Sequence, residues 1–174
     1  RHRDIALSMG ISEGEVVAAH VGIDANDAMF RAIRLHGPWH EMIKELESLG
    51  VVMALTRNES CVHEKLGQYT KVSGQEVGLV LGSEIDLRIF YQQWAHGFAV
   101  IENAADGCHR SLQFFDQSGV AIHKVIMKED SDVFAYEQLI QKFRDSNQDP
   151  LISVQPMPEQ EKTKADDQVD IPGF

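Results

Sequence analysis

The sequence predicts an α+β fold, in which helices at the two ends of the chain accompany a large antiparallel β-sheet. Apolar residues alternate with a period of two over residues 51–127, short turn sequences interrupt this stretch, and helical apolar spacing occurs on either side of it. With 174 residues, 43% of them hydrophobic, the chain can bury one core. We therefore expect one domain over residues 1–145 and an acidic, proline-containing linker or tail over residues 146–174.

Two short helices are expected at the beginning of the chain. The first covers residues 3–9 and ends at Gly10. Ser12 and Glu15 form a capping box that begins a second helix, which runs to Ala19. The pair resembles a helix-turn-helix, so a DNA-binding regulator is one alternative. Its second helix is acidic where a recognition helix needs Arg, Lys, Asn or Gln, and the net charge of -11 repels polyphosphate. We expect no nucleic-acid partner and interpret the pair as structural.

A strand and a longer helix come next. The strand is expected at residues 29–35, and the helix begins at Pro38 and ends at Gly50. One face of this helix is apolar and should lie on the sheet; it consists of Met42, Ile43, Leu46 and Leu49.

The alternating stretch contains most of the sheet. Strands are expected at residues 51–57, 61–69, 77–81, 86–93, 97–102, 109–115 and 120–127. Turn sequences such as Ser73-Gly74 and Asp106-Gly107 separate them, and such short connections favour antiparallel pairing.

One helix closes the predicted domain. Asp130 or Ser131 is expected to cap it. Its buried stripe has the spacing i, i+3, i+4, i+7 and consists of Tyr136, Leu139, Ile140 and Phe143. Four of the five prolines and an excess of acids lie beyond Ser146, where no apolar period remains, as is typical of a linker.

Composition also bears on location. No run approaches the roughly 18 apolar residues of a membrane span, and no signal peptide is recognisable, so we expect no membrane insertion and a cytoplasmic location. The two cysteines, Cys61 and Cys108, suit a reducing compartment. Because the chain begins with Arg1, we expect it to be a fragment of a longer protein.

Sequence motifs for metal binding are weak, and motifs for catalysis are absent. Cys61 with His63 and Cys108 with His109 could supply four zinc ligands, but neither pair has the spacing of a structural zinc site. No nucleophile elbow, P-loop or dinucleotide fingerprint is present, so hydrolase and nucleotide-binding functions have no support. Catalytic residues stay unassigned.

The predicted strand at residues 86–93 is more informative. Arg88 and Phe90 share one face with Gln92, while Leu87 and Ile89 share the other. One interpretation is an ordinary half-buried strand in which Arg88 pairs with a nearby acid. The other is a site for a flat, apolar, anionic ligand, with Phe90 packing on its plane and Arg88 meeting its carboxylates. Haem fits that description.

Several stretches together resemble the amino-terminal half of the bacterial haemin-transport and haemin-degrading proteins. They are residues 3–6 and 10–15 at the opening helices, Arg57-Asn58-Glu59 through Val62-His63-Glu64-Lys65-Leu66-Gly67, Ile85-Asp86-Leu87-Arg88-Ile89-Phe90 with Trp94, and Ser111-Leu112-Gln113-Phe114-Phe115-Asp116 with Gly119. The resemblance covers about residues 1–145, and the combination is far more specific than any single motif.

The resemblance implies a cytoplasmic haem-binding protein built from two similar halves, which receives imported haem and, in some members, opens the ring and releases iron. By position, Arg88 would contact a propionate, Phe90 would line the haem pocket, and His63 would be the candidate axial ligand of the iron. The residues themselves leave open a solvent-facing role for His63. Partners implied are a haem importer or haem-degrading enzyme, and the missing carboxy-terminal half or a second copy. The family's best-supported axial histidine lies beyond the linker, outside this chain.

Overall fold

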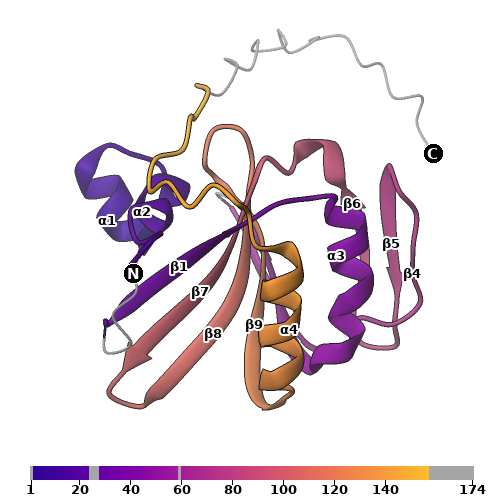
Figure 1. The fold of residues 1–174 in the computed structure, drawn as a ribbon. Helices are drawn as coiled ribbons and strands as arrows, with labels where there is room; N and C mark the ends of the chain where they lie inside the picture. The colour runs from indigo at the N-terminus through magenta and orange to yellow at the C-terminus, as the bar shows by residue number, and fades with distance from the viewer. Residues whose placement is uncertain (1, 24–27, 59, 157–174) are drawn as a thin grey trace, which may run out of the picture.

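The computed structural model describes residues 2–23, 28–58 and 60–156, and shows helices at both ends and two sheets between them (Figure 1). The helices are α1 (His2–Met9), α2 (Glu13–Ala18), α3 (Trp39–Glu45), the 3-10 helices η1 (Leu46–Leu49) and η2 (Tyr91–Gln93), and α4 (Val133–Phe143). The strands are β1 (Phe30–Leu35), β2 (Gly50–Arg57), β3 (Val62–Gly67), β4 (Val72–Ser73), β5 (Val77–Leu81), β6 (Asp86–Phe90), β7 (His96–Ala104), β8 (Gly107–Phe115) and β9 (Ala121–Ser131). The predicted α+β class is confirmed.

The strands divide between two antiparallel sheets. The main sheet has six strands in the order β1-β7-β8-β9-β2-β3, and the small sheet has three in the order β4-β5-β6. The sequence did not predict this division. The strand predicted over residues 86–93 is too long, because the chain turns into η2 after Phe90, where the Trp94 N–H donates to the Tyr91 carbonyl at 3.0 Å. The strand predicted over residues 61–69 likewise ends early, at Gly67.

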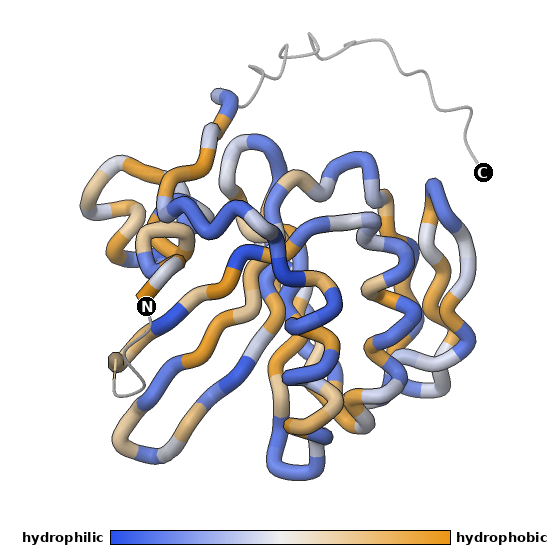
Figure 2. The backbone as a smooth tube through the Cα atoms, in the orientation of Figure 1, coloured by the Kyte–Doolittle hydropathy of each residue, from blue (hydrophilic) through white to orange (hydrophobic). Residues whose placement is uncertain are grey.

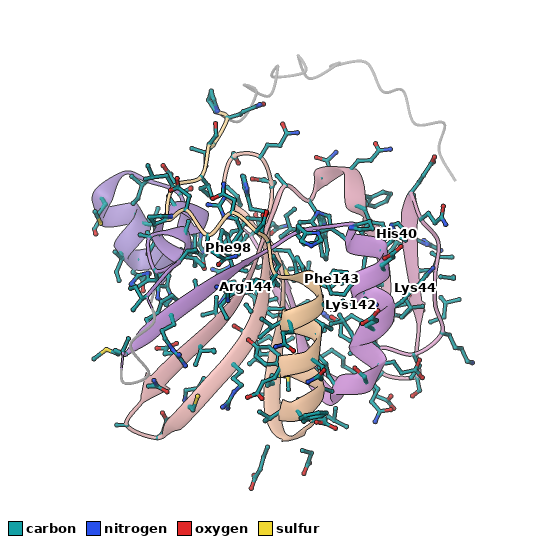
Figure 3. All side chains as sticks on the ribbon, viewed as in Figure 1. His40, Lys44, Phe98, Lys142, Phe143 and Arg144 are labelled. Carbon is teal, nitrogen blue, oxygen red and sulfur yellow. The ribbon has the colours of Figure 1, made fainter. Side chains whose placement is uncertain are left out.

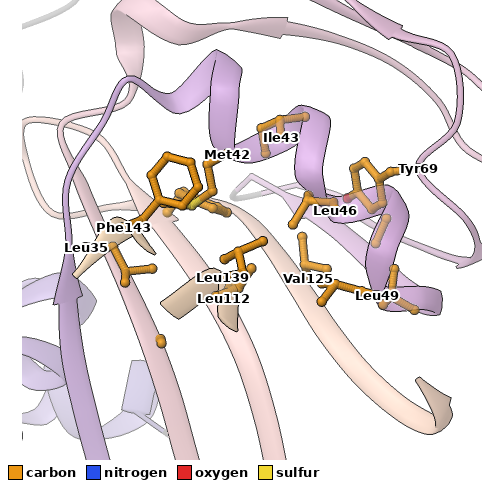
Figure 4. Packing of buried hydrophobic residues seen from close by; sticks show 14 of the residues in the cluster. Leu35, Met42, Ile43, Leu46, Leu49, Tyr69, Leu112, Val125, Leu139 and Phe143 are labelled. Atoms are coloured by element: carbon orange, nitrogen blue, oxygen red, sulfur yellow. The ribbon is translucent and has the colours of Figure 1, made fainter. Parts of the chain in front are cut away.

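The main core lies between one face of the main sheet and the helices α3, η1 and α4, and α4 packs against both α3 and η1. Figure 4 shows part of this core, where residues of α3 and η1 approach Leu112 and Val125 of the sheet. The predicted apolar faces of both helices are buried there: Met42, Ile43, Leu46, Leu49, Tyr136, Leu139, Ile140 and Phe143. Figure 3 places Phe143 at the end of α4 beside α3. We call this side of the sheet the covered face.

The other side, which we call the open face, is covered mainly at one end. Val17, Ala18 and Val21 in and after α2 pack there with Phe98 and Phe115 in a second cluster. Blue and orange segments alternate along the strands in Figure 2, as expected for strands whose two faces differ in polarity. Val100, Ser111 and Gln113 in the middle of this face are also buried, whereas Val62 and Leu66 at the β3 edge are exposed.

The residues that cap α2 and α4 can be compared with those predicted from the sequence. The predicted capping box of α2 is confirmed: Glu15 N–H donates to Ser12 Oγ at 3.2 Å, and Ser12 N–H donates to Glu15 Oε2 at 2.8 Å. The predicted cap of α4 is wrong by one or two residues. Asp132 caps it by accepting from the Ala135 N–H at 2.9 Å, since Ser131 is still part of β9.

Residues 145–156, here called the strap, lie along the domain surface although they fall largely in the predicted linker. The Gln148 side chain accepts from the Arg34 N–H and donates to the Arg34 carbonyl, each at 3.0 Å. The Arg34 guanidinium donates to the Leu151 carbonyl at 2.7 Å, and Ile152 packs against the second cluster. The domain boundary at residue 145 stays a prediction, and residues 157–174 lie outside the described part.

A buried histidine joins the main sheet to the segment after β3. His123 of β9 is 3% exposed; its Nδ1 lies 2.8 Å from Thr56 Oγ1 and its Nε2 lies 2.6 Å from the Tyr69 hydroxyl. The Tyr69 side chain is fully buried and its hydroxyl has no other partner among the described residues, so we infer that Tyr69 donates to Nε2 and His123 donates from Nδ1 to Thr56. This arrangement requires a neutral imidazole, and burial lowers the pKa of His123 to about 4.

We expect the free energy of unfolding to fall as the pH drops from 6.5 to about 4, because the unfolded chain binds a proton at His123 that the folded protein does not. A shift of this size corresponds to about 3 kcal/mol over that window. Urea denaturation at several pH values measures it. His123→Gln, which cannot titrate, should show a shallower slope; an unchanged slope would contradict the assignment.

Candidate functional site

The outer face of the small sheet brings together Arg88, Phe90 and three aliphatic side chains. Phe90 pairs with Val77 and Arg88 pairs with Leu79 in the antiparallel register of β5 and β6. Because paired residues point to the same side, Val77, Leu79, Leu81, Arg88 and Phe90 form one surface, which we call the outer patch. Phe90 is 59% exposed, whereas Ile89 is 5% exposed. The predicted division of β6 into two faces is thus confirmed as far as Phe90.

The contacts of Arg88 bear on one of the two interpretations of this strand. An ordinary half-buried strand was expected to pair Arg88 with an acid. Within the described part of the chain, Arg88 forms no ion pair and no side-chain hydrogen bond. An exposed aromatic ring beside an unpaired guanidinium can bind a flat, apolar ligand that carries carboxylates.

His63 lies elsewhere. It is exposed on β3, at the edge of the main sheet, and pairs across the strands with Thr56. His63 and Thr56 line a cavity of about 270 Å³ together with Leu87. Since Leu87 and Arg88 point to opposite faces of β6, His63 meets the inner side of this strand and Arg88 lies on its outer side. The structure does not bring the three predicted site residues into one pocket.

A larger cavity, of about 620 Å³, lies on the open face of the main sheet beneath α1. Its floor includes Ser111 and Gln113 of β8 and Lys124 of β9. No pattern in the sequence predicted this site. The polar residues of β8 alternate with buried Leu112 and Phe114, which is a signal for a polar open face but not for a cavity.

Other candidate features do not form a site in the structure. No group of three or more His, Cys, Asp or Glu residues within the described part of the chain could hold a metal ion. Cys61 and Cys108 are both exposed free thiols. Among the described helices, none has the length and apolar character needed to cross a membrane.

Comparisons with known proteins find one matching family and several similar proteins whose names refer to haem. A family model described as the haemin-degrading HemS.ChuX domain matches residues 10–143. The hemin transport protein HmuS of Yersinia pestis is 39% identical over 170 residues, which are 95% of this chain and 47% of the relative. The chain thus spans about half the length of the curated relatives it matches.

Two solved structures agree with these matches. Holo-PhuS, a heme-binding protein from Pseudomonas aeruginosa, has a TM-score of 0.87 and 43% identity over 98% of this chain and 48% of its own. ChuS, an E. coli heme oxygenase, has a TM-score of 0.77 and 35% identity over 88% of this chain and 45% of its own. The resemblance noted in the sequence is confirmed, and the chain belongs to the family of the haemin-degrading HemS.ChuX domain.

Proposed function

We propose that this chain is a haem-handling module that receives imported haem for trafficking and iron release, and that it contributes Arg88 and Phe90 to the binding surface. The observation that carries the proposal is the outer patch, where an exposed ring lies next to a guanidinium that forms no ion pair with any described residue, on adjacent positions of one strand face. Holo-PhuS, which this chain resembles in structure, is named as a heme-binding protein, and this supports haem as the ligand of the outer patch. Because the relatives are about twice as long, the second half or a second copy is proposed to complete the site.

The chemistry of the outer patch suits a haem edge. Phe90 can pack on the porphyrin plane, and Val77 and Leu81, which are 41% and 48% exposed, extend the apolar contact. Removing such surface from water contributes about 25 cal/mol for each Å². Arg88 can donate two parallel hydrogen bonds to a propionate carboxylate, which fixes the orientation of the ring.

His63 is proposed as the axial ligand that this half offers. Its ring is exposed and makes no hydrogen bond within the described residues, so either nitrogen is available to iron. Bound iron would supply the redox chemistry, and His63 would hold it. Because His63 and Arg88 lie on opposite sides of β6, both can serve one haem only if the ligand spans the edge of that strand. The spectra of single variants decide whether His63 takes part.

A second candidate function is haem degradation, which the name of ChuS as a heme oxygenase favours. In that case the protein residues would position haem and exclude water, and haem would be the substrate. We place either activity in the cytoplasm, to which the two free thiols are suited. A haem importer or a separate haem-degrading enzyme is the proposed exchange partner.

Alanine at position 88 or 90 should weaken haemin binding without moving the Soret maximum, because neither side chain is proposed to touch the iron. Loss of a charged hydrogen bond at Arg88 should raise the Kd about tenfold. Absorbance titration of the purified chain with haemin gives both values. Gln92→Ala, next to the patch in η2, is the matched control and should bind as the unmodified protein does. Equal Kd values for all four proteins would refute the outer patch.

If His63 is the axial ligand, His63→Ala should broaden and shift the Soret band at saturating haemin. His36→Ala is a suitable control, since His36 lies directly after β1, outside both cavities. An unchanged spectrum in His63→Ala would remove His63 from the site and leave the outer patch proposal standing.

A carrier and an enzyme differ in the fate of the bound haem. A reductant and oxygen added to the haemin complex should leave the Soret band intact if the chain only carries haem. Progressive bleaching of the band, accompanied by release of iron to a ferrous chelator, would instead assign degradation.

A further inference from the structure

His96, the first residue of β7, lies against the strap on the open face of the main sheet. Arg34 of β1 pairs with Phe98, and His96 is two residues from Phe98 on the same face, so His96 and Arg34 are diagonal neighbours. The ring of His96 forms a hydrogen bond with the backbone of Ser153 in the strap. One titratable side chain therefore connects the sheet to the strap.

The other ring nitrogen of His96 is buried without a partner. Nε2 makes no hydrogen bond to any described residue, so the bond to Ser153 comes from Nδ1. Because Nδ1 carries the proton that it donates, Nε2 of the neutral ring has only a lone pair. Protonation of the ring would place a second N–H and a positive charge at this buried atom. A buried charge that lacks an acceptor is strongly unfavourable.

The surroundings of His96 favour its neutral form. Burial, and after it the positive charge of Arg34 on β1, lower the pKa of His96. The Ser153 backbone and the negative charge of Asp116, in the turn after β8, act in the opposite direction and raise it. The pKa of His96 with the strap in place is therefore below the ordinary histidine value of 6.5.

Arg34 also holds the strap. Its guanidinium donates to the carbonyl of Asp149 at 2.5 Å and to that of Leu151 at 2.7 Å. Its backbone exchanges two hydrogen bonds with the side chain of Gln148. A positive charge on His96 would repel the same guanidinium that keeps the strap on the sheet.

We propose that residues 148–156 of the strap form an acid-sensitive latch, which docks on the sheet while His96 is neutral and leaves it when this ring is protonated. A docked state that binds a proton less readily than the released state loses population as the pH falls below 6.5. The latch determines where the chain leaves the domain, because residues 157–174 follow it. It is independent of the proposed haem surface, which lies on the small sheet.

The backbone N–H of Gln155 reports whether the strap is docked, because it donates to the Gln117 carbonyl at 2.8 Å. Its hydrogen exchange is measured by NMR on the full chain at about pH 7.5 and about pH 5.5, and each rate is corrected for the intrinsic exchange rate at that pH. The protection factor should be lower at the acidic pH by about threefold or more. Equal protection factors at the two pH values would overturn the latch.

His96→Gln keeps a donor for the Ser153 backbone but cannot titrate, so the protection of Gln155 should no longer depend on pH in this range. His109→Gln is the matched control, since His109 is an exposed histidine near the tip of the β7–β8 hairpin, and it should retain the pH dependence. A pH dependence that survives in His96→Gln would overturn the latch.

The same linkage predicts that a weaker strap raises the pKa of His96. Gln148→Ala removes two of the bonds to Arg34, so the pKa of His96, followed by NMR of its ring protons, should rise toward the ordinary value. Leu151→Ala should leave it unchanged, because this side chain is 78% exposed. This comparison decides the question if His96→Gln does not fold: an unchanged pKa in Gln148→Ala would contradict the proposal.

Discussion

Burial of one face of the main sheet beneath α3, η1 and α4 determines where this protein can bind anything. The helices supply Met42, Ile43 and Leu46, and the strands meet them with Leu112 and Val125, all fully buried. A face packed at this density has no room for a ligand. Binding surfaces are therefore restricted to the open face, to the small sheet and to the edges between them. The outer patch and the two cavities all lie in these places.

Much of this architecture could be predicted from local patterns. Alternation located most strands, the Ser12–Glu15 spacing located the start of α2, and the faces of β6 correctly separated Arg88 and Phe90 from Ile89. What failed depends on contacts between distant parts of the chain. Nothing local indicates that β1 pairs with β7, or that β4, β5 and β6 form their own sheet. The same holds for the cap of α4, which shifts to Asp132 because β9 continues to Ser131.

The candidate sites also differ in whether local sequence patterns or contacts between distant segments bring their residues together. Arg88 and Phe90 are two positions apart on one strand, so alternation alone places them together. The cavity beneath α1 needs Leu55, Val100 and Gln113 from three strands, and no spacing in the sequence relates them. The position of His63 could be predicted only in part. Its place on a strand could be predicted, but its separation from Arg88 depends on how the small sheet packs against β3.

The strap has a consequence for how the domain avoids self-association. A free sheet edge offers unpaired backbone groups to any other strand. At β1 the amide of Gln148 occupies the N–H and carbonyl of Arg34, much as the backbone of a neighbouring strand would. At the opposite edge, β3 has no such cover within the described residues and carries Glu64 and Lys65, charges that discourage edge-to-edge aggregation. A protease cut before Gln148 would free the Arg34 N–H but leave much of this edge closed, because the Ala32 N–H still donates to the His20 carbonyl and the Asp145 N–H to the Arg34 carbonyl. The edge of β1 is therefore protected against pairing with a second chain at several independent points.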